Sequence, residues 1–86
     1  MKRVRLNGVL LYVSGESLAC SAYMVCREFG DRGARRWTVN RRTNLALPGD
    51  VWDAWTCIDD HATMREAQRA VEMLQQKDKN ISPNAA

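Results

Sequence analysis

The chain has 86 residues, of which 45% are hydrophobic and 27% charged, a composition typical of one small folded domain with a net charge of +3. Its longest apolar run, Val9–Val13, is far shorter than the roughly 20 residues of a membrane span. That run is also shorter than the core of a secretory signal, about 7–15 residues. We therefore expect a cytoplasmic protein that does not associate with membranes and is too small for an elaborate active-site cleft.

Charge is unevenly distributed along the chain. Residues 1–44 contain nine basic and three acidic residues, a balance of +6, whereas residues 45–86 contain four basic and seven acidic residues, a balance of −3. Such an asymmetry favours an acidic partner for the first half, most commonly nucleic acid.

From the N-terminus, the first segment is rich in residues that favour strands. Val4 and Leu6 alternate with arginines, and the apolar run Val9–Val13 follows the turn-forming dipeptide Asn7-Gly8. This pattern predicts either a small hairpin about the dipeptide or one strand with a bulge there.

The segment Leu18–Phe29 fits two patterns, because its apolar residues match both a helical stripe and one face of a strand. The residues that follow favour the strand. A turn with two glycines at residues 30–33 leads into Arg36–Arg41, where apolar and polar residues alternate. We therefore predict a hairpin formed by Tyr23–Phe29 and Arg36–Arg41.

A long connection, Thr43–Asp50, ends in the turn signal Pro48-Gly49. The next segment, Val51–Ile58, again fits both a helix and a strand. Its tryptophan, threonine and isoleucine residues favour a strand, which is our prediction.

The clearest element is an amphipathic helix from Thr63 to Lys77. Its apolar residues recur at steps of three and four, and Thr63 with Glu66 has the spacing of an N-terminal capping box. The last nine residues, Asp78–Ala86, have almost nothing to bury and are expected to form a disordered tail. The folded domain is therefore predicted to span residues 1–77.

Together these elements predict an α+β fold, a three- or four-stranded antiparallel sheet with one C-terminal helix packed on one face. The core should join the sheet to the apolar stripe of the helix. Its candidate residues are Tyr23, Val25, Phe29, Trp37, Val39 and Trp55 from the sheet, and Met64, Ala67, Val71 and Leu74 from the helix.

The cysteines and the single histidine do not form a recognisable metal site. The spacing of Cys20 and Cys26 is longer than the short pair typical of structural zinc, and Cys57 and His61 span the predicted loop between strand and helix. We interpret the cysteines as reduced, buried thiols and expect no metal or other cofactor.

No catalytic pattern emerges either. Asp59 and Asp60 are adjacent, point apart on a regular backbone and are better interpreted as acidic flanks of the helix that follows. The turn Gly30–Gly33 lacks the spacing and the lysine of a phosphate-binding loop. A Cys57–His61 nucleophile pair has no supporting motif, so we expect that the protein is not an enzyme.

The arginines in and beside the predicted hairpin give the main functional indication. On an exposed sheet face they would contact phosphates, with neighbouring side chains near the bases. The alternative is that they are solvated charges that keep the hairpin soluble and protect its edges. The candidate nucleic-acid-binding residues are Arg32, Arg35, Arg36, Trp37, Thr38, Arg41 and Arg42. DNA is the favoured partner.

Two tryptophans favour a second hypothesis, a protein-binding module. Trp52 and Trp55 would lie on opposite faces of the predicted strand, so one of them would be exposed as an interface anchor. Its partner would be a host protein that this chain inhibits, or a second copy in a homodimer.

The order of elements resembles that of the arm-binding domain of phage and transposon tyrosine integrases, and of plant AP2-type domains. The shared features are a basic N-terminus, an arginine-rich hairpin, a further strand and a capped helix, over roughly Leu11 to Lys77. The resemblance is one of layout, without a diagnostic motif. It implies a three-stranded sheet in the major groove, with Arg32, Arg35, Arg36, Trp37, Thr38 and Arg41 facing the DNA.

The chain departs from those domains in its long connection Thr43–Asp50 and in the nearly all-apolar segment Val51–Ile58. In size and composition it also resembles the small accessory proteins of phages and prophages. Many of those inhibit host proteins and include anti-CRISPR and anti-restriction proteins, which is what this second resemblance implies for the protein-binding hypothesis.

Overall fold

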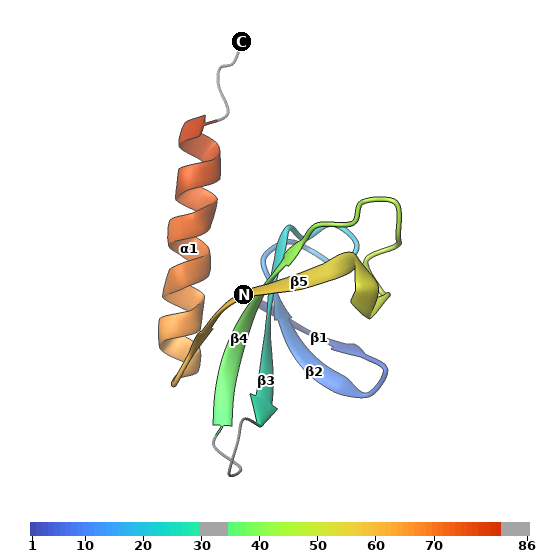
Figure 1. Cartoon of the computed structure of the whole chain (residues 1–86), viewed down its shortest axis with the longest axis horizontal. Coiled ribbons are helices and arrows are strands. Elements are labelled where there is room, and N and C mark those ends of the chain that lie inside the picture. Colours follow the sequence, from blue (N-terminus) through green and yellow to red (C-terminus); the bar gives the residue numbers. More distant parts are fainter. Residues whose placement is uncertain (30–34, 82–86) are drawn as a thin grey trace.

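The computed structural model describes residues 1–29 and 35–81, which form one sheet and one long helix (Figure 1). In chain order the elements are β1 (Lys2–Leu6), β2 (Val9–Val13), β3 (Tyr23–Phe29), β4 (Arg35–Arg42), a 3-10 helix (Trp52–Ala54), β5 (Trp55–His61) and α1 (Met64–Ile81). The strands are all antiparallel to their neighbours and follow the order β1-β2-β3-β4-β5, so β1 and β5 are the edges.

The predicted α+β class is confirmed, but the sheet has five strands rather than three or four. The difference arises at Asn7-Gly8, where the backbone φ angles are 51° and 83°. These left-handed conformations are those of a tight hairpin turn, so residues 2–13 form two paired strands and not one bulged strand.

The predicted central hairpin is confirmed. Strand β3 has the predicted bounds, and β4 is one residue longer at each end than the predicted Arg36–Arg41. Val25 pairs with Val39 at the middle of the two strands. The turn between them, residues 30–34, lies outside the described residues.

The predicted strand Val51–Ile58 is wrong in its first half. The N–H of Ala54 donates to the carbonyl of Val51, closing the 3-10 turn, and β5 begins only at Trp55. The carbonyl of Ala54 accepts hydrogen bonds from the N–H groups of Thr43 and Asn44. These bonds fasten the connection after β4 to the start of β5, which local strand propensity does not reveal.

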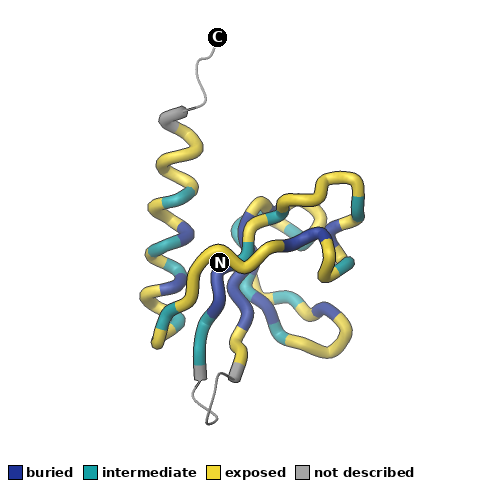
Figure 2. Tube along the Cα trace, in the orientation of Figure 1, coloured by how far each residue is buried: buried dark blue, intermediate teal, exposed yellow. Residues whose placement is uncertain are grey.

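Because side chains alternate along a strand, the two faces of the sheet carry separate hydrophobic clusters. Figure 2 marks the buried residues along the strands and the helix. The helix cluster lies between the sheet and α1 and consists of Tyr23, Val25, Val39, Ala67 and Val71, with Tyr12, Trp37, Met64, Ala70 and Leu74 packed around it. The loop cluster lies on the opposite face and consists of Leu6, Leu11, Val13, Met24, Cys26, Ala54 and Trp55, with Val4, Leu18 and Leu47 packed around it.

Most of the residues predicted to pack under the helix do so, but Trp55 is buried on the opposite face of the sheet. That tryptophan belongs to the loop cluster, where its Nε1 donates to the carbonyl oxygen of Gly49 at 2.8 Å. It therefore anchors the 43–54 connection rather than the helix. The side chain of Phe29 lies outside the described residues.

The helix begins as predicted and ends later. The Thr63 hydroxyl accepts the Glu66 N–H at 3.2 Å and donates to the Glu66 carboxylate at 2.9 Å, which satisfies one N–H of the first turn. The helix continues to Ile81, so the predicted tail is wrong for residues 78–81, and the Tyr23 hydroxyl donates to Asp78 at 2.5 Å. Residues 82–86 lie outside the described part. No helix within that part has the length and apolarity needed to cross a membrane.

Stability of the helix cluster can be tested with two neighbouring helix positions. Val71 is 1% exposed and Met73 is 67% exposed. We expect Val71→Ala to lower the free energy of unfolding by about 2 kcal/mol, through lost burial and a cavity, and Met73→Ala to change it little. Urea unfolding followed by circular dichroism measures both. Equal effects would show that α1 does not pack through this face.

Candidate nucleic-acid interface

Strand β4 divides the predicted arginines between the two faces of the sheet. Arg36 and Arg42 point to the face opposite α1, and Arg41 lies on the helix-bearing face, with its Cζ 6.0 Å from the centre of the Tyr23 ring. Arg35 begins β4, but its side chain lies outside the described residues. Arg32 also lies outside them. The hairpin arginines whose side chains the structure describes, Arg36, Arg41 and Arg42, therefore do not lie on the same face of the sheet.

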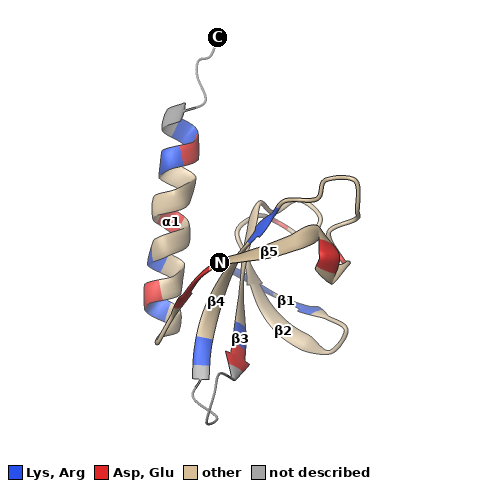
Figure 3. Cartoon of the chain, in the orientation of Figure 1, with Lys and Arg blue, Asp and Glu red and all other residues tan. Residues whose placement is uncertain are grey.

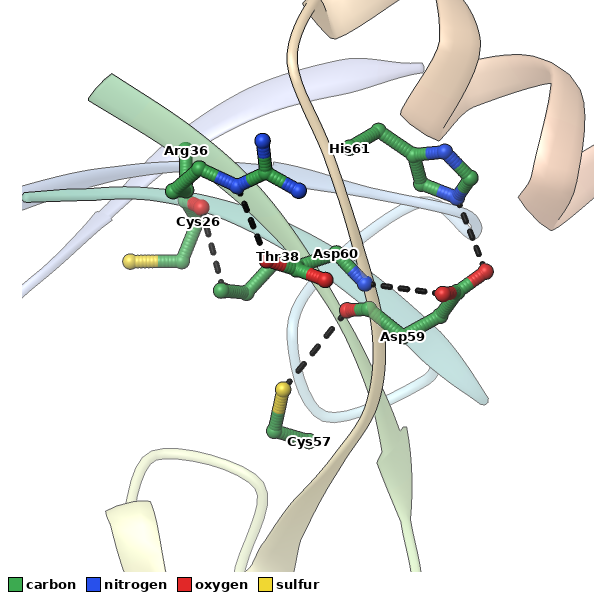
Figure 4. A network of polar contacts seen from close by, with 7 residues as sticks. All are labelled: Cys26, Arg36, Thr38, Cys57, Asp59, Asp60 and His61. Atoms are coloured by element: carbon green, nitrogen blue, oxygen red, sulfur yellow. Dashed lines mark hydrogen bonds and ion pairs between the residues drawn. The ribbon is translucent and has the colours of Figure 1, made fainter. Parts of the chain in front are cut away.

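Arg36 is held by an ion pair. Its Nε donates to a carboxylate oxygen of Asp60 at 2.8 Å (Figure 4). This hydrogen bond and the charge attraction lower the pKa of Asp60 and raise the pKa of Arg36. Asp59 and Asp60, interpreted from the sequence as acidic flanks of the helix, lie at the end of β5, just before the helix begins.

Arg42 and Thr38 have structural roles. The Arg42 guanidinium donates to the carbonyl of Ala19 at 2.7 Å and to that of Leu47 at 2.9 Å, which ties together the two loops that cover the loop cluster. Thr38 is buried, and its hydroxyl donates to the carbonyl of Cys26 at 3.1 Å. Thr38 is therefore not available to contact a base, contrary to the sequence-based prediction.

A different basic surface lies on the helix-bearing face, on the part of the sheet away from α1. Cross-strand pairing places Arg3 beside Tyr12 and Arg5 beside Leu10, while Arg27 pairs with Trp37. We call these six residues the arginine–aromatic surface: Arg3, Arg5, Leu10, Tyr12, Arg27 and Trp37. Figure 3 shows basic residues on the strands that carry it.

Two adjoining clefts run through this surface and share Leu10. One has a volume of about 390 Å³ and is lined by Arg3, Val4, Arg5 and Leu10, and the other has about 240 Å³ and is lined by Val9, Leu10, Tyr12, Arg27 and Trp37. No acidic residue occurs among the described residues that line the two clefts. The local field is therefore positive beside apolar walls, an arrangement that attracts anionic ligands.

The aromatic rings of the surface are half-buried and tilted. The centres of the Tyr12 and Trp37 rings are 6.2 Å apart, with 60° between their planes. The Arg27 guanidinium lies 5.9 Å from the centre of the Trp37 ring. Both rings pack their inner edges against the helix cluster, which holds them in place.

The candidate residues predicted from the sequence did not include Arg3, Arg5, Tyr12 or Arg27. The alternation of Arg3 and Arg5 along β1 was a usable signal, since it puts both on one face. No signal in the sequence indicated that Arg3 and Arg5 lie near Trp37. Their proximity depends on the pairing of four strands across more than 30 residues.

Of the two tryptophans proposed as interface anchors, only Trp52 is exposed. Trp52 lies in the 3-10 helix with 39% of its surface accessible, whereas Trp55 is 8% accessible and belongs to the core. One of the two tryptophans is therefore exposed, as expected, and the burial of Trp55 excludes it as the exposed anchor. The role of Trp52 stays a prediction, and its exposure follows from the turn rather than from alternation along a strand.

The cysteines are free, but only Cys26 is buried, so the buried-thiol interpretation is wrong for Cys20 and Cys57. Burial, and secondarily the charge of Glu28, raises the pKa of the Cys26 thiol to about 11, which makes it a poor nucleophile. Cys57 and His61 lie on opposite faces of β5, since their β4 partners point to opposite faces. No cluster of three or more metal-binding side chains occurs within residues 1–29 and 35–81.

Comparison of the chain with protein families, with curated proteins and with solved structures found no match.

The effect of Arg36 on the pKa of Asp60 can be tested by titration. We expect Arg36→Gln to return the pKa of Asp60 towards its ordinary value, while Arg65→Gln on the exposed side of α1 should leave it unchanged. Carboxyl ¹³C NMR titration measures both. Because the pKa of Asp60 is lowered in the folded state, its stabilisation is present above the unfolded-state pKa and is lost as pH falls through the folded value. An unaltered titration in Arg36→Gln would contradict the pairing.

Proposed function

We propose that this protein binds nucleic acid through the arginine–aromatic surface. The observation that carries the proposal is that three arginines and two partly buried aromatic rings lie on one sheet face. Two clefts run along this face, and the described residues that line them include no acid. Sequence reasoning located the same function on the arginine-rich hairpin. The structural roles of Arg36, Thr38 and Arg42 favour the neighbouring surface instead.

The arginine side chains are suited to phosphate contacts. Arg3 and Arg5 are exposed on the same face of β1, about 7 Å apart along the strand, so each can contact a different phosphate. Arg27 adds a third positive charge two strands away. Contacts of this kind supply most of the sequence-independent affinity for nucleic acid.

The simpler interpretation of these arginines is protection of the sheet edge. Charged residues on an edge strand discourage pairing with another chain, and β1 is an edge. Edge protection accounts for Arg3 and Arg5. It does not account for Arg27, which lies on the interior strand β3, or for the two partly buried aromatic rings beside it.

A second candidate function is protein binding, favoured by the exposure of Trp52. Large exposed aromatic residues dominate many protein interfaces. Its partner would be a host protein or a second copy of the chain. The nucleic-acid proposal has the stronger support, since it uses five side chains with complementary chemistry and not one.

Salt dependence tests the nucleic-acid proposal. We expect binding to a mixed-sequence oligonucleotide at about 50 mM salt, with affinity falling steeply as salt rises. Replacing Arg5 by Ala should flatten the plot of log affinity against log salt by about 0.7–0.9, the contribution of one phosphate contact. Fluorescence anisotropy measures the slope.

Arg69→Ala is the matched control, because Arg69 is an exposed arginine on α1 and its loss changes the net charge equally. An equal loss of slope in both variants would show that binding follows net charge alone. Absence of binding at about 50 mM salt would overturn the proposal. Arg35→Ala tests the original hairpin hypothesis in the same assay.

A further inference from the structure

We propose that the arginine–aromatic surface selects single-stranded over double-stranded nucleic acid, by stacking an unpaired base against Trp37 and Tyr12. This inference rests on the proposed nucleic-acid binding and specifies its substrate class. The site is the 240 Å³ cleft lined by Val9, Leu10, Tyr12, Arg27 and Trp37.

The walls of this cleft match a base better than a phosphate. Of the five described residues that line it, four are apolar or aromatic and Arg27 is the one that is charged. The Tyr12 and Trp37 rings are tilted by 60° and are not stacked face to face on each other. A planar base inserted there would gain stacking and burial together, as in other single-strand-binding proteins.

The adjoining cleft supplies the matching backbone site. It contains Arg3 and Arg5 and adjoins the aromatic cleft at Leu10, so a strand that follows both clefts would form one path across the sheet. From β1 to β4 this path crosses three strand spacings, about 14 Å. That length accommodates a few nucleotides, with phosphates over β1 and a base beside Trp37 on β4.

Duplex nucleic acid cannot use the aromatic cleft in the same way. Its bases are stacked on each other, and their faces are unavailable unless a base leaves the helix at a cost of a few kcal/mol. A duplex would retain the phosphate contacts of Arg3 and Arg5 and lose the contact with Trp37. The bases of a single strand can unstack, so a single strand gains both the phosphate contacts with Arg3 and Arg5 and the stacking contact with Trp37.

The test compares a single strand with an abasic strand that carries the same number of phosphates, and with a duplex that carries the phosphates of two strands. The probes are a single-stranded oligothymidylate of about twelve nucleotides, an abasic strand of the same length, the matching duplex and an oligouridylate, each with a fluorescent label. We expect oligothymidylate to bind the full chain at least about 10-fold more tightly than the abasic strand, the effect of one stacked base, and more tightly than the duplex. The oligouridylate distinguishes RNA from DNA as the preferred strand.

Protein variants identify the stacking residues. Trp37→Leu and Tyr12→Leu should each bring the affinity for oligothymidylate closer to that for the abasic strand. Trp52→Leu, which removes an exposed tryptophan outside the surface, should retain the full difference. Trp37 also packs against the helix cluster, so circular dichroism must show that its variant is folded. If it is not, the abasic comparison with the unmodified protein still decides the question.

Three outcomes separate this inference from the proposed function. Preference for oligothymidylate over both the abasic strand and the duplex, lost in Trp37→Leu, supports both. Equal binding of oligothymidylate and the abasic strand, or tighter binding of the duplex, overturns single-strand selection and leaves nucleic-acid binding in place. No binding to any of the four probes overturns both.

Discussion

The pairing of β3 with β4 is the constraint on which the rest of the structure depends, because this hairpin is covered on both faces. Val25 and Val39 lie under α1, while Met24 and Cys26 lie in the loop cluster on the other side. A strand pair buried on both faces has its register fixed, since a slip of one residue would exchange the two sets of side chains. The β1–β2 hairpin, β5, the loops and the helix all take their positions from it.

This arrangement explains why a basic surface remains open beside the helix. Helix α1 packs on β3, β4 and β5, and covers Tyr23, Val25 and Val39. The β1–β2 hairpin extends the same sheet face beyond the helix, where the arginines of β1 remain exposed. The rings of Tyr12 and Trp37 lie at the boundary, so the helix cluster fixes their inner edges and leaves the cleft beside them open to a ligand.

The arginines of this chain have several distinct roles despite their similar appearance in the sequence. Arg42 donates to two loop carbonyls, and Arg36 pairs with Asp60. Arg42 uses its guanidinium as a multiple hydrogen-bond donor, and both side chains connect segments that are far apart in the chain. Arg3 and Arg5 are exposed on an edge strand, and the Arg5 guanidinium donates to the carbonyl oxygen of Gly8 at 3.4 Å. Charge clustering along the sequence therefore indicates a basic half, and individual contacts decide which arginines are available to a partner.

Local patterns in the sequence determined the elements whose signals lie within a few residues. The capping pair Thr63 and Glu66 and the helical spacing of the apolar residues located α1, and alternation with a glycine-containing turn located β3 and β4. Only the tertiary structure decided the rest. The start of β5 depends on hydrogen bonds from residues 43 and 44 to Ala54, and the end of α1 is extended beyond Lys77, where Asp78 meets Tyr23. The candidate site likewise exists only where β1 to β4 lie side by side, because no local signal brings Arg3 and Arg5 beside Trp37.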